Sequence, residues 1–315
     1  MGAEKVILKT DFLKQYSAEG RIENTEAPEL NFMRGLCGKN PELIKKSWSE
    51  KPFYGYSSSV YMPVGVYTGY SAIETMIKEW FEVFEAVTMQ VIPVTQLSSN
   101  GRSASEVVVR MERSEDTLEV PMCIVAELHN KESVENVRIY HTAKWTRSLL
   151  PCRKHIFRSD ATSKGSDNCL TGGMREYFNA LHTPSLERLL GMVDHENSCY
   201  GGYRPDYLEP IHHGIEAFQK IYEHMVTDIP SRLTIRWETI TVKDNIWIVE
   251  WNGFTNPCVH SYVPCPPIGE YEEEAQCGVA VYEFNEEQKL IRVSICDEYG
   301  LQYPLEDYPE LAGNG

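Results

Sequence analysis

Two aspartates stand where a helix and a strand are expected to end, and both could exchange protons with a bound molecule. Asp194 follows the helical run 189–193 and precedes a loop rich in Tyr and Gly. An acid is unusual there, because the helix C-terminus carries partial negative charge. Asp297 ends a row of alternate apolar residues that begins at Ile291. Partial desolvation of such a carboxylate raises its pKa and suits general acid–base catalysis, unless both acids are simply solvated.

A third acid, Glu250, lies in an expected strand whose neighbours on both faces are apolar. By the two-residue period of a strand it shares a face with Ile246 and Ile248. It therefore either faces a pocket or lies at an edge turned to solvent. His195, the residue after Asp194, could replace that aspartate as the proton carrier.

Two further side chains complete the candidate catalytic set. Tyr200, in the loop after Asp194, could donate a hydrogen bond to a developing oxyanion. His141 shares a face with Val137 and Ile139 at the end of a strand in the first half of the chain. A lone histidine on an apolar strand face is more often a satisfied core residue, and that interpretation stays open.

An apolar ligand would be bound by aromatic side chains on the elements around these acids. The candidate substrate-binding residues are Trp237, Trp247, Trp251, Tyr203, Phe218 and Tyr222. His195, His212 and His213 show no ligand spacing with Cys or Asp partners, so we expect no metal site. No G-x-G-x-x-G, P-loop or G-x-S-x-G motif occurs, so we expect neither a cofactor nor serine-hydrolase chemistry.

The charge and composition of the chain restrict its partners. Its 315 residues carry a formal net charge of −16, which repels phosphate backbones and makes nucleic acid a poor partner. No apolar run of about 18 residues occurs, so we expect no membrane partner. The N-terminal residues lack the apolar stretch of a signal peptide, and the nine cysteines show no C-x-x-C spacing. We therefore expect a cytoplasmic protein with reduced thiols.

The same order of elements occurs twice in the chain. A glycine opens a strong helical pattern at Gly69 and again at Gly214, about 150 residues later, which indicates a duplicated domain rather than a short solenoid repeat. Each half ends in a similar strand, which contains Arg138 in the first half and Arg292 in the second. The expected parts are an N-terminal arm over 1–28, a first domain over 29–158, a linker over 159–173, a second domain over 174–302 with an insertion at 255–277, and a tail over 303–315.

Hydrophobic periodicity predicts the elements of each half. In the first half we expect two helices that meet at Asn40-Pro41, a loop or short edge strands over 51–68, a helix from Ser71, and strands over 87–96, 106–113, 120–129 and 136–146. In the second half we expect a helix over 174–193, a loop over 196–212, a helix over 214–227, and strands over 232–241, 245–253, 278–284 and 290–297. Such strands bury one face only if helices lie across it. Each half is therefore predicted to be an α+β domain with a curved antiparallel sheet wrapped around helices.

These motifs resemble the SnoaL-like branch of the NTF2-like superfamily. The resemblance rests on the acid-ended helix 189–194, the helix starts at 69–73 and 214–218, and the last strands at 138–141 and 292–297. It covers about 30–150 and 174–300, and it implies two tandem cones with cofactor-free chemistry in a pocket between helix and sheet. Relatives include polyketide cyclases, scytalone dehydratase, ketosteroid isomerases and epoxide hydrolases, while other members only bind ligands or form dimers. The Arg and Asp that such hydrolases carry on one strand are absent here, where Ile248 and Glu250 occupy that spacing.

The leading hypothesis is a cofactor-independent enzyme that cyclises, dehydrates or isomerises a small hydrophobic metabolite of polyketide or terpenoid type. Asp194 and Asp297 would form the acid–base pair in the second half, assisted by Glu250 and Tyr200. One alternative is a non-catalytic small-molecule-binding or dimerisation module, which would fit a homodimer. The other is an epoxide-opening cyclase or hydrolase.

Overall fold

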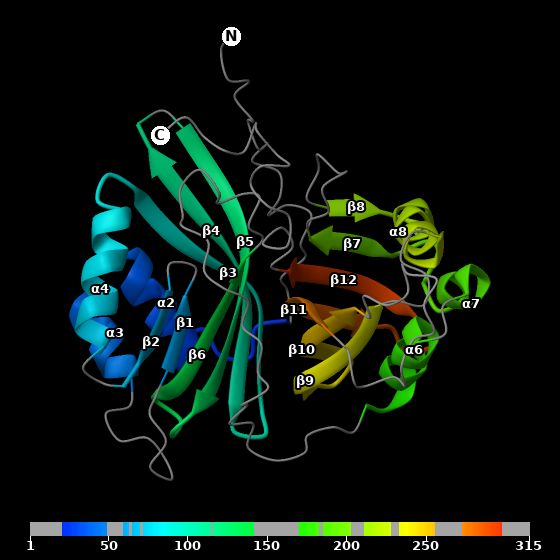
Figure 1. Cartoon of the computed structure of the whole chain (residues 1–315), viewed down its shortest axis with the longest axis horizontal. Coiled ribbons are helices and arrows are strands. Elements are labelled where there is room, and N and C mark those ends of the chain that lie inside the picture. Colours follow the sequence, from blue (N-terminus) through cyan, green and yellow to red (C-terminus); the bar gives the residue numbers. More distant parts are fainter. Residues whose placement is uncertain are drawn as a thin grey trace. The chain divides into compact units, whose positions relative to one another are not determined.

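The computed structural model describes most of both halves of the chain (Figure 1). The described residues are 21–48, 59–62, 65–69, 72–114, 116–141, 170–182, 185–202, 211–227, 233–255 and 273–297. They fall into two compact units, one that ends at His141 and one that extends from Leu170 to Asp297.

In the first unit, helices α2 (Pro28–Cys37), α3 (Pro41–Ser47) and α4 (Ala72–Val83) lie on one side of a six-stranded sheet (Figure 1). The strands are β1 (Ser59–Met62), β2 (Gly65–Thr68), β3 (Thr88–Ser99), β4 (Arg102–Arg113), β5 (Asp116–Leu128) and β6 (Val134–His141). Their order in the sheet is β2-β1-β6-β5-β4-β3. The four long strands pair antiparallel, whereas the short β1 runs parallel to β6.

The second unit repeats this arrangement. Its helices are α6 (Gly172–His182), α7 (Leu186–Gly191) and α8 (Ile215–Thr227). Its strands are β7 (Cys199–Gly202), β8 (Ile211–His213), β9 (Leu233–Lys243), β10 (Ile246–Thr255), β11 (Glu273–Phe284) and β12 (Leu290–Asp297). The strand order in its sheet, β8-β7-β12-β11-β10-β9, matches the order in the first sheet strand by strand. The predicted fold class, two tandem α+β units in which a curved sheet wraps around helices, is confirmed.

Several predicted elements differ in detail. Two helices, α6 and α7, occupy the range 174–193 where one helix was expected. Ser185 caps the start of α7, because its side chain accepts the backbone N–H of Arg188 at 3.5 Å. The expected loop over 196–212 contains the short strands β7 and β8, so each sheet is mixed rather than purely antiparallel. Strand β11 begins at Glu273, within the expected insertion, and residues 256–272 of that insertion lie outside the described residues.

Strand pairing also corrects the predicted alignment of the two halves. Asn136 pairs with Ser59 of β1, and Arg292 pairs with Cys199 of β7 at the same place in the second unit. Arg292 therefore corresponds to Asn136, and the counterpart of Arg138 is Ser294. The similar Arg-containing sequences of the two strands are therefore out of register by two residues. Because side chains alternate with a period of two, Arg138 and Arg292 still lie on the same face of their sheets.

The repeated glycines have a shared backbone role. Gly69 and Gly214 precede α4 and α8 with φ values of +84° and +82°. This left-handed conformation is costly for a residue with a Cβ atom. The glycine repeat in the sequence is therefore a requirement of the turn that starts each of these helices.

Replacing either glycine should cost stability through backbone strain alone. A Cβ atom at Gly69 or Gly214 would meet nothing within 4 Å, so Gly214→Ala should lower the free energy of unfolding by about 1 kcal/mol. Gly191→Ala is the matched control, because a Cβ there also meets open space and its φ is not positive. Urea unfolding of the full chain measures both variants. Equal effects of Gly214→Ala and Gly191→Ala would contradict the strain argument.

The helix-facing sides of the two sheets form separate cores of different character. In the first unit this core combines aliphatic residues of the strands with Phe32, Trp80 and Phe84. The indole N–H of Trp80 donates to the carbonyl of Leu36 at 3.2 Å and so joins α4 to α2. The second core is richer in aromatic rings, among them Tyr177, Phe178, Phe218, Tyr222, Trp247, Trp251, Tyr282 and Phe284.

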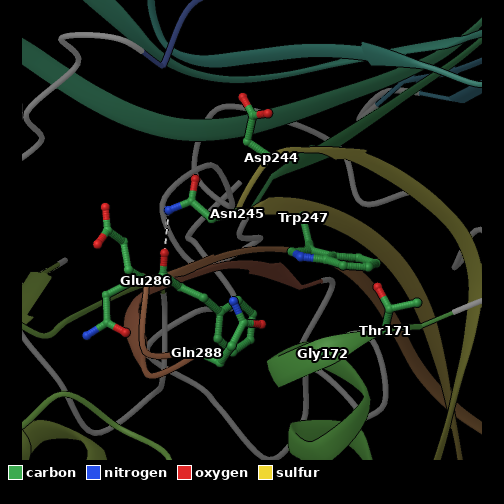
Figure 2. A pocket seen from close by; sticks show the side chains of 9 residues that line it. Thr171, Gly172, Asp244, Asn245, Trp247, Glu286 and Gln288 are labelled. Carbon is green, nitrogen blue, oxygen red and sulfur yellow. Dashed lines mark hydrogen bonds between the residues drawn. The ribbon is translucent and has the colours of Figure 1, made fainter.

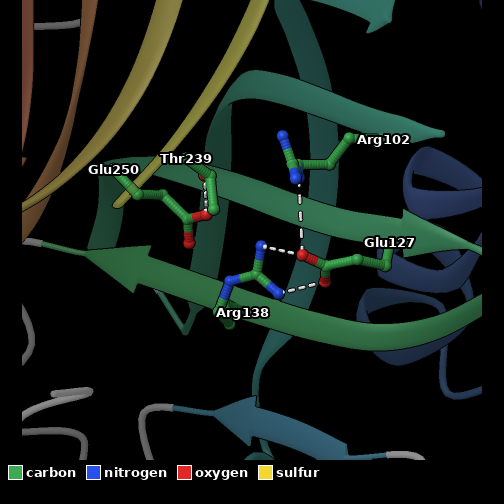
Figure 3. A network of polar contacts seen from close by, with 5 residues as sticks. All are labelled: Arg102, Glu127, Arg138, Thr239 and Glu250. Carbon is green, nitrogen blue, oxygen red and sulfur yellow. Dashed lines mark hydrogen bonds and ion pairs between the residues drawn. The ribbon is translucent and has the colours of Figure 1, made fainter. Parts of the chain in front are cut away.

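The opposite face of the first sheet carries a buried charged network (Figure 3). The carboxylate of Glu127 on β5 accepts two hydrogen bonds from the guanidinium of Arg138 on β6. Arg102 on β4 reaches the same carboxylate with its Nε at 3.4 Å. All three side chains are only 1% exposed. Two buried cations therefore share one buried anion.

Neutralising this anion should destabilise the first unit strongly. Glu127→Gln leaves two buried guanidinium groups without their shared charge, a loss that typically costs about 3–5 kcal/mol. Glu82→Gln is the control, since Glu82 forms only an exposed pair with Lys78 at 3.8 Å and should cost about 0.5 kcal/mol or less. Chemical unfolding of the full chain would contradict the prediction if both variants lost equally little.

Candidate functional site

Asp194, the first predicted catalytic acid, holds a turn together. One carboxylate oxygen accepts the backbone N–H groups of Glu196 and Asn197, both at 3.0 Å. The other accepts the side-chain amide of Asn285 at 3.1 Å. These hydrogen bonds, first of all that from Asn197, lower the pKa of Asp194. The residue thus favours its ionised form and connects the end of α7 to the turn between β11 and β12.

Asp194 and Asp297 do not form the predicted acid–base pair. The backbone N–H of Asp194 donates to the carbonyl of Leu290, the first residue of β12. Asp297 is the last residue of that strand, and at about 3.3 Å per residue the two ends of β12 lie roughly 23 Å apart. This separation is too large for both carboxylates to contact one small substrate. The side chain of Asp297 itself lies outside the described part of the chain.

Glu250 lies on the side of the second sheet that faces away from the helices. Its strand neighbours Val249 and Trp251 belong to the helix-facing core, so Glu250 points to the opposite side. There it is 1% exposed and accepts a hydrogen bond from the hydroxyl of Thr239 (Figure 3). The sequence correctly placed Glu250 on the face of Ile246 and Ile248, but this face is not the one that lines the interior of the cone.

The other catalytic candidates are also separated. His195 is exposed and its Nε2 lies 3.2 Å from the carbonyl oxygen of Leu190. His141 is buried in the first unit, where its backbone pairs with Met122. Tyr200 pairs with Val293 and His212 through its backbone on β7, and its side chain is outside the described residues.

Four of the six predicted binding residues, by contrast, lie in one core. Trp247, Trp251, Phe218 and Tyr222 all lie in the core between the helices and the sheet of the second unit. Trp237 stands opposite Trp251 in the strand register, but its side chain is not described, and Tyr203 lies outside the described residues.

A row of aromatic side chains runs through this core and includes residues that sequence reasoning missed. Trp247 and Tyr282 are direct partners on neighbouring strands. The ring of Tyr282 lies 5.4 Å from that of Tyr177 on α6, and the hydroxyl of Tyr222 on α8 donates to the hydroxyl of Tyr177 at 3.2 Å. Tyr177 fits the apolar spacing of its helix, and Tyr282 lies in the apolar run of its strand, after Val281. The sequence signal was therefore one of core packing rather than of function.

A cavity of about 470 Å³ opens at one end of this row (Figure 2). It lies where the start of α6, the turn between β9 and β10 and the turn between β11 and β12 meet. Its lining residues are Thr171, Gly172, Asp244, Asn245, Trp247, Phe284, Asn285, Glu286 and Gln288. Trp247 and Phe284 belong both to this lining and to the aromatic core. Two aromatic residues at the end of the core therefore form part of the cavity wall, and the cavity volume suits a small organic molecule.

The start of α6 is held firmly at the edge of this cavity. The side-chain oxygen of Gln288 accepts the backbone N–H of Gly173 at 2.9 Å. A Cβ atom at Gly173 would lie 2.8 Å from the carbonyl oxygen of Gln288 and from the ring of Phe284. Only glycine permits this close approach. The contact sets the position of α6 and, through it, that of Tyr177.

Other kinds of site find little support in the described residues. No group of three or more His, Cys, Asp or Glu side chains converges there as a metal site would. Burial raises the pKa of the Cys37 thiol to about 12, which makes it a poor nucleophile. No helix within the described ranges is long and apolar enough to cross a membrane.

We expect Asp194 to contribute to the stability of the fold rather than to catalysis. Because its pKa is lowered in the folded state, its stabilising contribution is present above the unfolded pKa and is lost as pH falls through the folded one. Asp194→Ala should therefore lower the melting temperature of the second unit at neutral pH, with a smaller difference from the unchanged protein in acid. Calorimetry at both pH values, with the exposed neighbour Glu196→Ala as control, measures this. A deficit that is as large in acid as at neutral pH would contradict the assignment.

No protein-family model matches the chain, and no curated protein matches it in sequence. Solved structures are similar to part of it. A SnoaL-like protein of unknown function from Burkholderia thailandensis is 12% identical over 39% of this chain and 89% of that protein, with a TM-score of 0.29. An NTF2-like protein of unknown function from Cytophaga hutchinsonii is 11% identical over 40% and 87%, with a TM-score of 0.27. A SnoaL-like protein from Agrobacterium tumefaciens, which carries an unproven assignment as an isomerase, is 17% identical over 39% and 92%, with a TM-score of 0.28.

Proposed function

We propose that the second unit binds a small, largely apolar molecule and carries out a cofactor-independent proton-transfer reaction on it. Cyclisation, dehydration and isomerisation are the reactions in this class. The observation that carries the proposal is the aromatic row that leads from the cavity beside Trp247 to the hydroxyl pair of Tyr177 and Tyr222.

The character of the row supports an apolar ligand. Aromatic walls provide large contact areas with few rotatable bonds, so they bind flat apolar molecules at a low entropic cost. Phe218, whose ring lies 5.9 Å from that of Tyr222, extends the wall beyond the hydroxyl pair. A ligand with one oxygen atom would place its apolar part against the rings and its oxygen beside the hydroxyl groups.

The hydroxyl pair supplies the chemistry that such a ligand needs. Tyr222 is fully buried and Tyr177 is 4% exposed, so the pair lies in an environment of low dielectric constant. A phenol hydroxyl can rotate, and the pair can therefore turn one O–H towards a ligand oxygen. A hydrogen bond given there stabilises the negative charge that develops on a carbonyl oxygen when a neighbouring proton is removed.

Asp297 is the proton acceptor that we propose. It is the last residue of β12, the strand whose residues Val293 and Ile295 pack in the same core as the tyrosines. Asp194 is not proposed for this role, because its carboxylate is occupied by the turn at the other end of the strand.

A non-catalytic binding module is the second candidate. It is favoured by the positions of Asp194 and Glu250, since neither of these two described acids lies beside the hydroxyl pair. The epoxide-opening alternative loses its basis for a similar reason. It requires two acids on either side of one pocket, and the expected pair stands at opposite ends of β12.

Removal of the tyrosine hydroxyls should weaken the reaction more than the fold. The full-length protein would be incubated with a small-molecule extract, and bound species and products would be followed by native mass spectrometry. Tyr222→Phe should reduce conversion by about 100-fold, the typical effect of losing one oxyanion donor. Tyr67→Phe is the matched control, because Tyr67 is a mostly buried tyrosine of the first unit whose hydroxyl donates to Glu79.

The outcomes separate the two candidates. A ligand that the unchanged protein converts and Tyr222→Phe merely retains would support the enzyme. A ligand that both proteins retain unchanged would support the binding module. Full conversion by the double variant Tyr177→Phe, Tyr222→Phe would contradict the proposed role of the hydroxyl pair.

A further inference from the structure

The first unit encloses a carboxyl group, that of Glu29, in a neutral polar cluster. Glu29 is the second residue of α2 and is fully buried. Its Oε1 accepts a hydrogen bond from the hydroxyl of Ser105 at 2.6 Å and a weaker one from the amide of Gln96 at 3.4 Å. Its Oε2 is buried and has no hydrogen-bond partner among the described residues. One half of this carboxyl group is therefore unsatisfied.

Burial favours the protonated form of this group. Desolvation raises the pKa of Glu29, and the hydrogen bonds from Ser105, Ser103 and Gln96 offset that rise only in part. A neutral carboxylic acid tolerates the site better, because removal of a charge from water costs far more than removal of a neutral group.

The side chains that contact Glu29 from β3 and β4 carry no charge. β3 and β4 face it with Gln96, Ser103 and Ser105, which are neutral. Residues of β5 such as Ala126 that lie on the helix-facing side are apolar. Arg102 and Glu127 belong to the opposite face of the sheet, where they bond to each other.

The chain just before α2 contributes two acids, Glu23 and Glu26, and one cation, Arg21. Glu23 accepts the backbone N–H of Ser98 at 3.2 Å. Glu26 forms an exposed pair with Arg34 of α2 at 3.5 Å, and Arg34 also donates to the carbonyl of Thr25. The carbonyl of Arg21 bonds to the backbone of β3. Glu23 opposes ionisation of Glu29 electrostatically, and the charges of Glu26 and Arg34 balance each other.

Residues 21–24, the strap, pair with the edge of the sheet at the residue that contacts Glu29. The backbone N–H of Gln96 donates to the carbonyl of Arg21 at 2.9 Å, and the N–H of Glu23 donates to the carbonyl of Gln96 at 3.2 Å. Ile22 forms a parallel bridge with Gln96. Since β3 is the last strand of its sheet, the strap covers part of an otherwise open edge.

The side chain of Gln96 connects the strap to Glu29 directly. Its oxygen accepts the backbone N–H of Asn24 at 2.7 Å. Its nitrogen donates to the hydroxyls of Ser98 and Ser103, both at 3.1 Å, and approaches Glu29. Any change that reorients this amide must therefore disturb the bond that holds the strap.

We infer that the strap is a pH-sensitive latch, which is docked on β3 while Glu29 is protonated and is released when Glu29 ionises. An ionised Glu29 attracts the N–H groups of Gln96 and requires water at its unsatisfied oxygen. The Gln96 amide can turn fully to the carboxylate only by giving up Asn24. Release of the strap admits water and exposes the edge of β3, a surface that can pair with another strand.

The sign of the pH dependence follows from protonation in the docked state. Because docking favours the proton on Glu29, the latch is stable at low pH and weakens as pH rises through the raised pKa. Hydrogen exchange of the full-length protein, corrected for the intrinsic rate, measures this at the N–H groups of Glu23 and Asn24. Between about pH 5 and about pH 9, the range that covers known buried glutamates, their protection should fall by at least about tenfold.

Three variants test the mechanism. Glu29→Gln keeps the shape of the side chain without its titration, so the strap should stay protected throughout this range. Glu26→Gln, an exposed acid three residues earlier, should keep the pH dependence of the unchanged protein. Gln96→Ala removes the side-chain bond to Asn24 and should leave the Asn24 N–H unprotected at every pH, with no pH dependence of strap protection, although the backbone bonds of the strap to residue 96 remain. The N–H of Leu128, which bonds to Gly101 within the sheet, reports whether the unit remains folded.

Two results would overturn the inference. One is strap protection in the unchanged protein that does not vary with pH. The other is a loss of strap protection in Glu29→Gln that equals the loss in the unchanged protein. If Glu29→Gln failed to fold, as judged at Leu128, a pH-independent strap in Gln96→Ala beside a pH-dependent one in the unchanged protein would still support the latch, and equal profiles would reject it.

Discussion

The packing of helices against one face of a curved sheet is the contact on which the rest of each unit depends. Strands of alternating pattern cannot hold both faces in water when one face is apolar, so the helices must cover that face. The burial of large side chains such as Trp80 in the first unit and Tyr222 in the second results from this packing. It also decides which residues lie inside the cone and which lie on the outer face of the sheet.

The two units differ where their first described helix begins, at α2 in the first unit and at α6 in the second. In the first unit, the start of α2 is closed by Glu29, Gln96 and the strap. In the second unit, the start of α6 meets Gln288 and leaves a cavity beside Trp247. A duplicated fold can therefore keep one copy closed and polar at this helix start while the other copy remains open to a ligand.

The buried polar groups on the outer face of the first sheet differ from those on the inner face of the second sheet. The outer face of the first sheet holds Glu127 between two arginines, an arrangement that requires good geometry because each buried ion pays a large desolvation penalty. The inner face of the second sheet instead carries polarity through tyrosine hydroxyls, which can be buried at much lower cost. The proposal of an apolar ligand with a single polar group rests on this difference.

Local patterns in the sequence were sufficient for the fold class and for most of the longer elements. Alternation predicted the four long strands of each unit, and Gly69 and Gly214 marked the same left-handed turn twice. The aromatic residues on the inner face were also predictable, since Trp247, Trp251, Phe218 and Tyr222 follow the periods of their strand and helix. These features depend on neighbours within a few residues, which is the range over which backbone geometry controls direction.

The grouping of the polar residues was decided only by tertiary structure. Sequence parity placed Glu250 on one face of β10, but it could not say which face the helices would cover. Asp194 and Asp297 each stand at the end of an element in the sequence, but strand pairing places them at opposite ends of β12. Tyr177, Tyr222 and Tyr282 are far apart in the chain and meet because two helices and a strand cross. Contacts between distant segments depend on how whole elements pack, and no local pattern in the chain encodes that arrangement.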